Sequence, residues 1–209
     1  HHHPIFWDFE NKVPAPIRNA QSTKDAFKYA VHYLYNVIRT SGPFITEISL
    51  FNEHLSGFAS GHGGWKRRFT KQKMIDAYLG STIGELLNSI ELPEAIRSIA
   101  IPKDQNGNSK SWIPTIFQLA VDICDALGYD NIKIGFNDFL IINGFHVANN
   151  FDPDERDNHQ FLGGVVNMLK ELKPGTGGDL ELESFYYYNR IHIAIESHIF
   201  SNNSIDNLS

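Results

Sequence analysis

The fold is decided by the stretch Ile5-Phe6-Trp7-Asp8-Phe9-Glu10-Asn11-Lys12-Val13-Pro14. It begins with three apolar residues, continues with acidic and amide side chains, and ends in a turn that contains proline. This order is typical of the first strand of an α/β fold, whose carboxyl end opens into the crevice where ligands bind. A carboxylate at that position is costly to desolvate unless a metal ion, a cation or a substrate meets it. The stretch therefore indicates chemistry, rather than packing alone, at Asp8, Glu10 and Asn11.

The rest of the chain alternates between strand-like and helix-like segments. Ser22 is placed to cap a helix, with Asp25 in its first turn, and apolar residues recur at helical spacing up to a stop at residues 41–43. Residues 12–20 are predicted to form a loop that contains proline. Further strands are predicted at residues 44–51, 95–101 and 131–136, and further helices at residues 66–90, with Gly80 as a candidate break, and at residues 112–127.

The order βαβαβαβ predicts an α/β fold with a mainly parallel central sheet and helices on both faces. The apolar first strand, residues 5–10, is expected in the middle of that sheet. A C-terminal extension is predicted to add a helix and further strands. Its segments are residues 161–172 for the helix and residues 180–188 and 190–200 for the strands.

One domain is expected, because 209 residues are enough for a single sizeable core and no repeat or low-complexity linker divides them. Its predicted bounds are residues 4–200. Residues 1–3 are three histidines and are interpreted as a remnant of a purification tag. Residues 201–209 are polar and are expected to form a flexible tail.

Composition excludes some classes of protein. No apolar run approaches the roughly 18 residues of a membrane span, so no membrane partner is expected. The single cysteine, Cys124, rules out an internal disulfide and fits an intracellular, cytoplasmic location. The net charge of −6 argues against a surface coated in basic side chains. It leaves nucleic acid open as a partner, because a local basic patch suffices for binding.

Several segments resemble NYN domains, which belong to the PIN-like ribonuclease superfamily. The first is Phe6-Trp7-Asp8-Phe9-Glu10-Asn11 with the following Val13-Pro14, which is similar to the opening of that family's eukaryotic branch. The others are Leu119-Ala120-Val121-Asp122, which resembles a helix that carries an acidic residue, and the strand Asn131 to Phe136 with its ending Asn137-Asp138-Phe139. The resemblance covers roughly residues 4–145. It implies a PIN-like or Rossmann-like sheet.

The resemblance also implies a site and an activity. Asp8, Asp122 and Asp138 would form a carboxylate cluster for Mg²⁺ or Mn²⁺, and Asn11 would assist at the first strand. Such hard cations prefer oxygen ligands, and they can neutralise a phosphodiester and activate water. The implied activity is cleavage of RNA, and the expected partner is single-stranded RNA. The sequence departs from the family at Asn52-Glu53, where the family has Gly-Asp, so a diverged or inactive member is also open.

The densest basic run follows a glycine-rich loop and is a candidate contact for nucleic acid. Its cations could contact phosphates while the tryptophan stacks on a base. The alternative is an ordinary solvated helix face. The residues of this run are Trp65, Lys66, Arg67, Arg68, Lys71 and Lys73.

Two other functions remain open from the sequence. A binding or scaffolding module would keep the α/β core without catalysis, and Asp8 would then be a turn residue beside the proline loop. A phosphatase of the haloacid dehalogenase type is the second, because Asp8 and Glu10 resemble the Asp-x-Asp strand end of that family. Dependence on a metal separates an enzyme from a scaffold, and the size of the phosphoester substrate separates the two enzymes.

Overall fold

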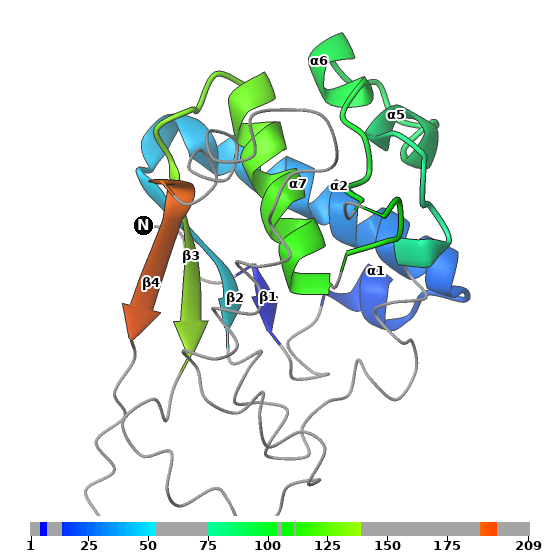
Figure 1. The fold of residues 1–209 in the computed structure, drawn as a ribbon, viewed down its shortest axis with the longest axis horizontal. Coiled ribbons are helices and arrows are strands. Elements are labelled where there is room, and N and C mark those ends of the chain that lie inside the picture. The colour runs from blue at the N-terminus through cyan, green and yellow to red at the C-terminus, as the bar shows by residue number, and fades with distance from the viewer. Residues whose placement is uncertain are drawn as a thin grey trace, which may run out of the picture.

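A computed structural model describes residues 5–7, 14–52, 75–103, 106–110, 112–138 and 189–195. In this part of the chain the strands form one sheet in the order β1-β2-β3-β4, and every neighbouring pair is parallel. Figure 1 shows the sheet beside a layer of helices, so the fold is of the mixed α/β type. The strands are β1 (Phe6–Trp7), β2 (Glu47–Asn52), β3 (Lys133–Asp138) and β4 (Ile191–Ile195).

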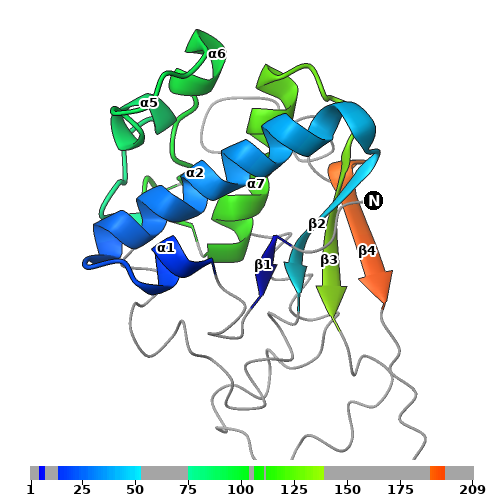
Figure 2. The same ribbon diagram turned by 180° about the vertical axis from the view of Figure 1, so that it is seen from behind.

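The described helices precede or connect these strands. Two of them are long, and Figures 1 and 2 show them crossing beside β1, with α7 nearer the viewer in the first view and α2 nearer in the second. The helices are α1 (Ala15–Arg18), α2 (Thr23–Ser41), α5 (Ile83–Leu86), α6 (Glu94–Arg97) and α7 (Trp112–Ala126), and a 3-10 turn, η2 (Gly42–Phe44), follows α2.

Helix α2 begins where the sequence predicts. The Ser22 hydroxyl accepts a hydrogen bond from the backbone N–H of Asp25 at 3.0 Å, which satisfies one of the free donors of the first turn. One face of the helix is buried in the core, and the periodicity of the sequence placed that face correctly. Its members are Ala26, Phe27, Ala30, Val31, Leu34, Tyr35 and Ile38.

The sheet is covered on both faces. Neighbouring residues of a strand point to opposite faces, and both Ile5 and Phe6 are buried. The same holds on β2, where three consecutive residues, Ile48, Ser49 and Leu50, are all buried. On one side Phe6 meets Tyr33 of α2 edge to face, with 6.2 Å between the ring centroids. Such double burial is typical of a parallel sheet in an α/β protein.

The predicted central position of the first strand is wrong for the described sheet, since β1 is at one end of its order and pairs there with β2. The apolar sequence of this segment indicates that both faces of β1 are covered, and the burial of Ile5 and Phe6 confirms this. Coverage of the faces does not specify lateral position, which depends on the partners of the strand edges. The described order also runs without reversal, whereas open α/β sheets with a ligand crevice usually have a reversal point.

Three other segments differ from their predictions. Residues 95–101 are not a strand: Pro93 and Glu94 begin the short helix α6, and only Ala100 makes an isolated antiparallel bridge, to Thr82. Within residues 75–90, turns and the short α5 replace the predicted long helix, because Gly80 adopts a φ of +87° that ends helical structure. The predicted loop at residues 12–20 contains α1, whose first turn tolerates proline.

The C-terminal extension is described only in part. The strand predicted at residues 190–200 is present as β4, parallel to β3. The helix predicted at residues 161–172 and the strand at residues 180–188 lie outside the described residues. The described helices include none long and apolar enough to cross a membrane.

Candidate functional site

The carboxyl ends of all described strands meet at one edge of the sheet, at the bottom of Figure 1, because the strands are parallel. The last row shared by β1 to β4 joins Trp7, Asn52, Asn137 and Ala194 in register. Asp138 follows in the next row, where it pairs with Ile195. In α/β folds, ligands usually bind at this edge of the sheet.

Of the three predicted carboxylates, Asp138 belongs to this edge in the described part of the chain. Asp138 is the last residue of β3. Asp8 lies outside the described residues, but it directly follows Trp7, and consecutive Cα atoms are about 3.8 Å apart. Because β2 separates β1 from β3, Trp7 and Asn137 are two strand spacings apart, roughly 9.6 Å. Two aspartates that flank one metal ion can span such a distance.

Asp122, the third predicted carboxylate, is placed differently. It is half-buried on α7, four residues before the helix ends at Ala126. Helix α7 runs from the bottom to the top of Figure 1, against the direction of the strands. Asp122 is therefore about 6 Å below the upper end of α7, while Asp138 is about 16 Å along β3 from Lys133. The backbone thus sets Asp122 nearer the amino ends of the strands than Asp138.

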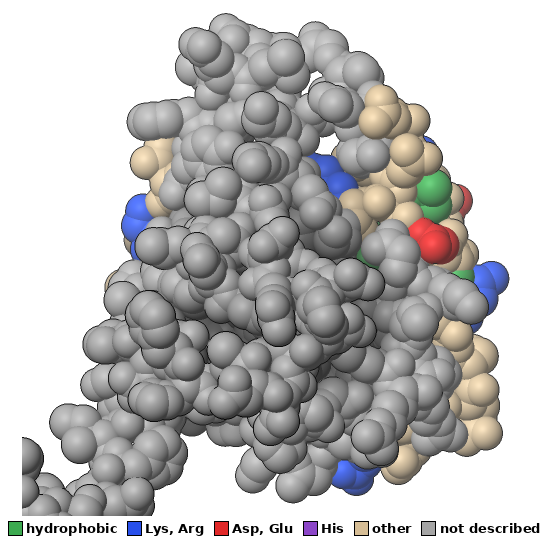
Figure 3. All heavy atoms as spheres, turned by 60° about the horizontal axis from the view of Figure 1, so that its bottom comes forward, with side chains coloured by type: hydrophobic (Ala, Val, Ile, Leu, Met, Phe, Trp, Pro, Cys, Tyr) green, Lys and Arg blue, Asp and Glu red, His purple; other side chains and the backbone are tan. Residues whose placement is uncertain are grey.

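The metal ligands themselves are not tested by the described side chains. Among these residues no group of three or more His, Cys, Asp or Glu side chains could hold a metal ion. Asn11 and the whole basic run, Trp65 to Lys73, lie outside the described residues, as do the side chains of Asp8 and Asp138. In Figure 3 the bottom of Figure 1 comes forward, and the coloured side chains are seen mainly at the right and left of the view.

A buried lysine near the N-terminal end of α7 was not predicted from the sequence. Lys110 precedes the helix, is only 2% exposed, and its Nζ donates to Oε1 of Gln118 at 2.8 Å. Its carbonyl accepts from the hydroxyl of Thr115 at 3.3 Å. A buried ammonium group is rare and needs a hydrogen-bond acceptor, which Gln118 provides here. The sequence gives little signal for it, because a lysine in a polar loop ordinarily predicts exposure.

Cys124 is excluded as a nucleophile in the folded protein. It is completely buried on α7, and burial raises the pKa of its thiol to about 12. Since the thiolate is the reactive form, the folded protein keeps this group inert. Cys124 belongs to the hydrophobic core.

The comparisons with known proteins do not assign this chain to a family. No protein-family model matches this chain, and no match was found among curated proteins or among solved structures.

Proposed function

We propose that the protein is a metal-dependent nuclease of the NYN or PIN-like type that cleaves single-stranded RNA at the carboxyl edge of its sheet. The observation that supports this proposal is the register of the strands. It aligns Trp7, the last described residue of β1, with Asn137 of β3, two strand spacings away. In the sequence, Asp8 directly follows Trp7 and Asp138 directly follows Asn137.

The donor set fits a hard divalent cation. Asp8 and Asp138 supply carboxylate oxygens, and Asn11 follows on the same chain segment as Asp8. Mg²⁺ prefers oxygen ligands and usually takes only one or two carboxylates, together with water and substrate phosphates. Asp122 completes the set that the family resemblance implies. Its position along α7 gives it a weaker claim to direct ligation than the two strand-end aspartates.

Each group has a role in the proposed reaction. Bound metal supplies charge neutralisation at the phosphate and a water of lowered pKa. Asp8 and Asp138 hold that charge in place, and Asn11 can orient the water or a phosphate oxygen through its amide. The basic run from Lys66 to Lys73, with Trp65, would contact the RNA strand on either side of the cleaved bond.

A non-catalytic binding module is the second candidate. The observation that favours it is the unreversed strand order in the described part of the sheet, because ligand crevices in open α/β sheets form at reversal points. Such a module would bind its partner without any need for a metal ion.

The test is a cleavage assay on a labelled single-stranded RNA, with Mn²⁺ and with EDTA. We expect cleavage with Mn²⁺ alone, and we expect Asp8→Asn to abolish it, since this change keeps the size of the side chain and removes its charge. The matched control is Asp130→Asn, at an exposed carboxylate in the turn before β3. Cleavage in EDTA, or full activity in Asp8→Asn, would refute the nuclease. Cleavage of small phosphoesters alone would favour a phosphatase.

A further inference from the structure

One side of α2, partly exposed and partly covered by residues 78–89, carries a row of basic residues. Lys24, Lys28 and His32 are four residues apart, and Arg39 follows seven residues later, so all four lie along one side of the helix. Lys24 and Arg39 are exposed, and Lys28 and His32 are half-buried. We call these four residues the α2 basic row. Figure 2 shows α2 in front, with α5 and α6 above its N-terminal half.

The partners of the basic row are neutral in the described structure. The Lys24 ammonium is 5.3 Å from the centroid of the Tyr78 ring, and the Lys28 ammonium donates to the hydroxyl of Ser89 at 3.4 Å. The Arg39 guanidinium is 5.6 Å from the centroid of the Tyr35 ring. Aromatic rings and hydroxyls hold these cations in place without cancelling their charge.

The local field along the row is positive. The pKa of His32 is lowered below its usual value, by burial first and then by the charges of Arg39 and Lys28. The neighbouring acid on α2 is Asp25, whose carboxylate accepts a hydrogen bond from the Ser22 hydroxyl at 2.7 Å. The pKa of Tyr78 is raised by burial first and then by the charge of Asp25. Helix α2 thus carries one carboxylate and three permanently charged cations.

We propose that the α2 basic row is a docking surface for the phosphate backbone of single-stranded RNA. A row of cations in a chain with a net charge of −6 is a local exception that favours a polyanion. Tyr29, 40% exposed on the same helix, offers a ring for stacking, which single strands accept and paired duplexes do not. The choice of RNA rests on the proposed function, but the α2 basic row shares no residue with the run at residues 65–73.

A membrane surface fits this helix poorly. An amphipathic helix binds a bilayer by inserting its apolar face. The apolar face of α2 is buried in the core of the protein, as the complete burial of Phe27 and Leu34 shows. The accessible side of α2 therefore offers charge, hydroxyls and the ring of Tyr29, which suits a hydrophilic polyanion.

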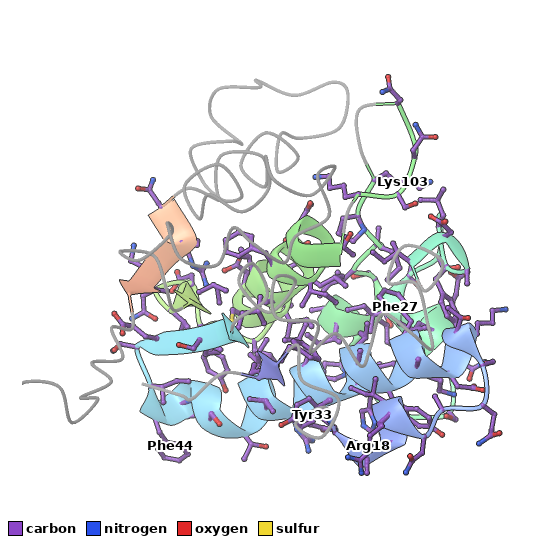
Figure 4. The ribbon with its side chains drawn as sticks, turned by 90° about the horizontal axis from the view of Figure 1, so that it is seen from below. Arg18, Phe27, Tyr33, Phe44 and Lys103 are labelled. Carbon is purple, nitrogen blue, oxygen red and sulfur yellow. The ribbon has the colours of Figure 1, made fainter. Side chains whose placement is uncertain are left out.

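The experiment is a salt titration of binding to a labelled single-stranded RNA, in EDTA so that cleavage cannot occur. The test variant is Lys24→Gln/Lys28→Gln, and the matched control is Arg97→Gln/Lys103→Gln, which removes the same charge from exposed positions. Figure 4 shows Lys103 away from α2. We expect the log–log slope of affinity against salt to fall by about 1.4 in the test variant, about 0.7 for each lost phosphate contact.

The outcomes separate the two proposals. Equal slopes in the wild type and the test variant, an equal change in the control, or no binding by the wild type would overturn the docking surface. Tighter binding of a duplex than of a single strand would overturn the single-strand assignment. A Tyr29→Ala variant should weaken binding with an unchanged salt slope, because stacking releases no counterions. RNA binding without metal-dependent cleavage would keep the docking surface and refute the nuclease.

Discussion

Arg190 binds Asp125 across 65 positions of the chain, with 2.5 Å between Nη1 and Oδ1. Its other donors reach two backbone carbonyls, that of Ile132 at 2.8 Å and that of Tyr129 at 3.0 Å. Arg190 thereby joins the beginning of β4 to the end of α7 and to the chain that enters β3. The residue is 4% exposed, so these contacts replace the water that its guanidinium gives up on folding.

Replacing Arg190 by Met should destabilise the fold strongly. The change keeps most of the aliphatic volume but removes the hydrogen bonds of the guanidinium to Asp125 and to the carbonyls of Ile132 and Tyr129. Because Asp125 retains some exposure, we expect a loss of about 2–4 kcal/mol, at or below the cost of breaking a fully buried pair. The measurement is urea unfolding followed by circular dichroism. The control is Lys133→Met, since Lys133 makes an exposed contact to Asn189 nearby and should change stability by less than about 0.5 kcal/mol. Equal losses in the two variants would contradict this account.

Gly42 is required by a close approach rather than by its backbone angles. Its φ of −49° and ψ of −42° suit any residue, but a Cβ at this position would be 2.3 Å from Cε2 of Tyr129. We expect Gly42→Ala to cost about 1–3 kcal/mol, as overpacking usually does. The check is a double-mutant cycle with Tyr129→Ala, in which the cost of Gly42→Ala should nearly vanish. An unchanged cost in that background would mean that the ring of Tyr129 is not the cause.

Cys124 should make stability depend on alkaline pH. Its thiol has a pKa of about 12 in the folded protein, while a thiol in an unfolded chain has a pKa of about 8.5. The folded state therefore holds its proton more tightly, so this contribution is complete below about pH 8.5 and falls as the pH rises toward 12. Unfolding free energies measured between pH 7.5 and 10 should decline more steeply in the wild type than in Cys124→Ala. Parallel curves would contradict the assignment.

The same thiol gives a chemical readout of burial. At pH 8.5, iodoacetamide should modify Cys124 slowly in the native protein and rapidly in urea, because the folded state provides little thiolate and no access. Fast native modification would show that this part of α7 opens readily.

Local patterns predicted the long helices well and the short elements poorly. The capping residue Ser22 and the periodic apolar residues after it placed α2, and similar periodicity placed α7. Residues 95–101 were misread because Ile96 and Ile99 suggest a strand, whereas Pro93 and Glu94 form the start of a helical turn. The pairing of β4 with β3 depends on contacts across more than 50 residues, which periodicity does not encode.

The candidate site was predictable only where it follows from strand ends. Asp138 lies at the carboxyl end of its strand, as predicted, while the register that aligns the preceding Asn137 with Trp7 required the sheet. The offset of Asp122 depends on the direction of α7 against the strands. The α2 basic row was not predicted from the sequence, although Lys24, Lys28 and His32 have helical spacing. The candidate contact for nucleic acid was assigned instead to the denser basic run at residues 65–73.

The central claim is that the strand-end aspartates bind a divalent metal ion, and calorimetric titration with Mn²⁺ tests it most directly. We predict one Mn²⁺ per chain in the wild type and in the control Asp130→Asn. We predict that Asp8→Asn and Asp138→Asn each lower the affinity by more than the roughly 10–100-fold that loss of an outer-shell partner costs, and that Asp122→Asn lowers it less. Wild-type affinity in Asp8→Asn and Asp138→Asn, or no Mn²⁺ binding by the wild type, would contradict the account.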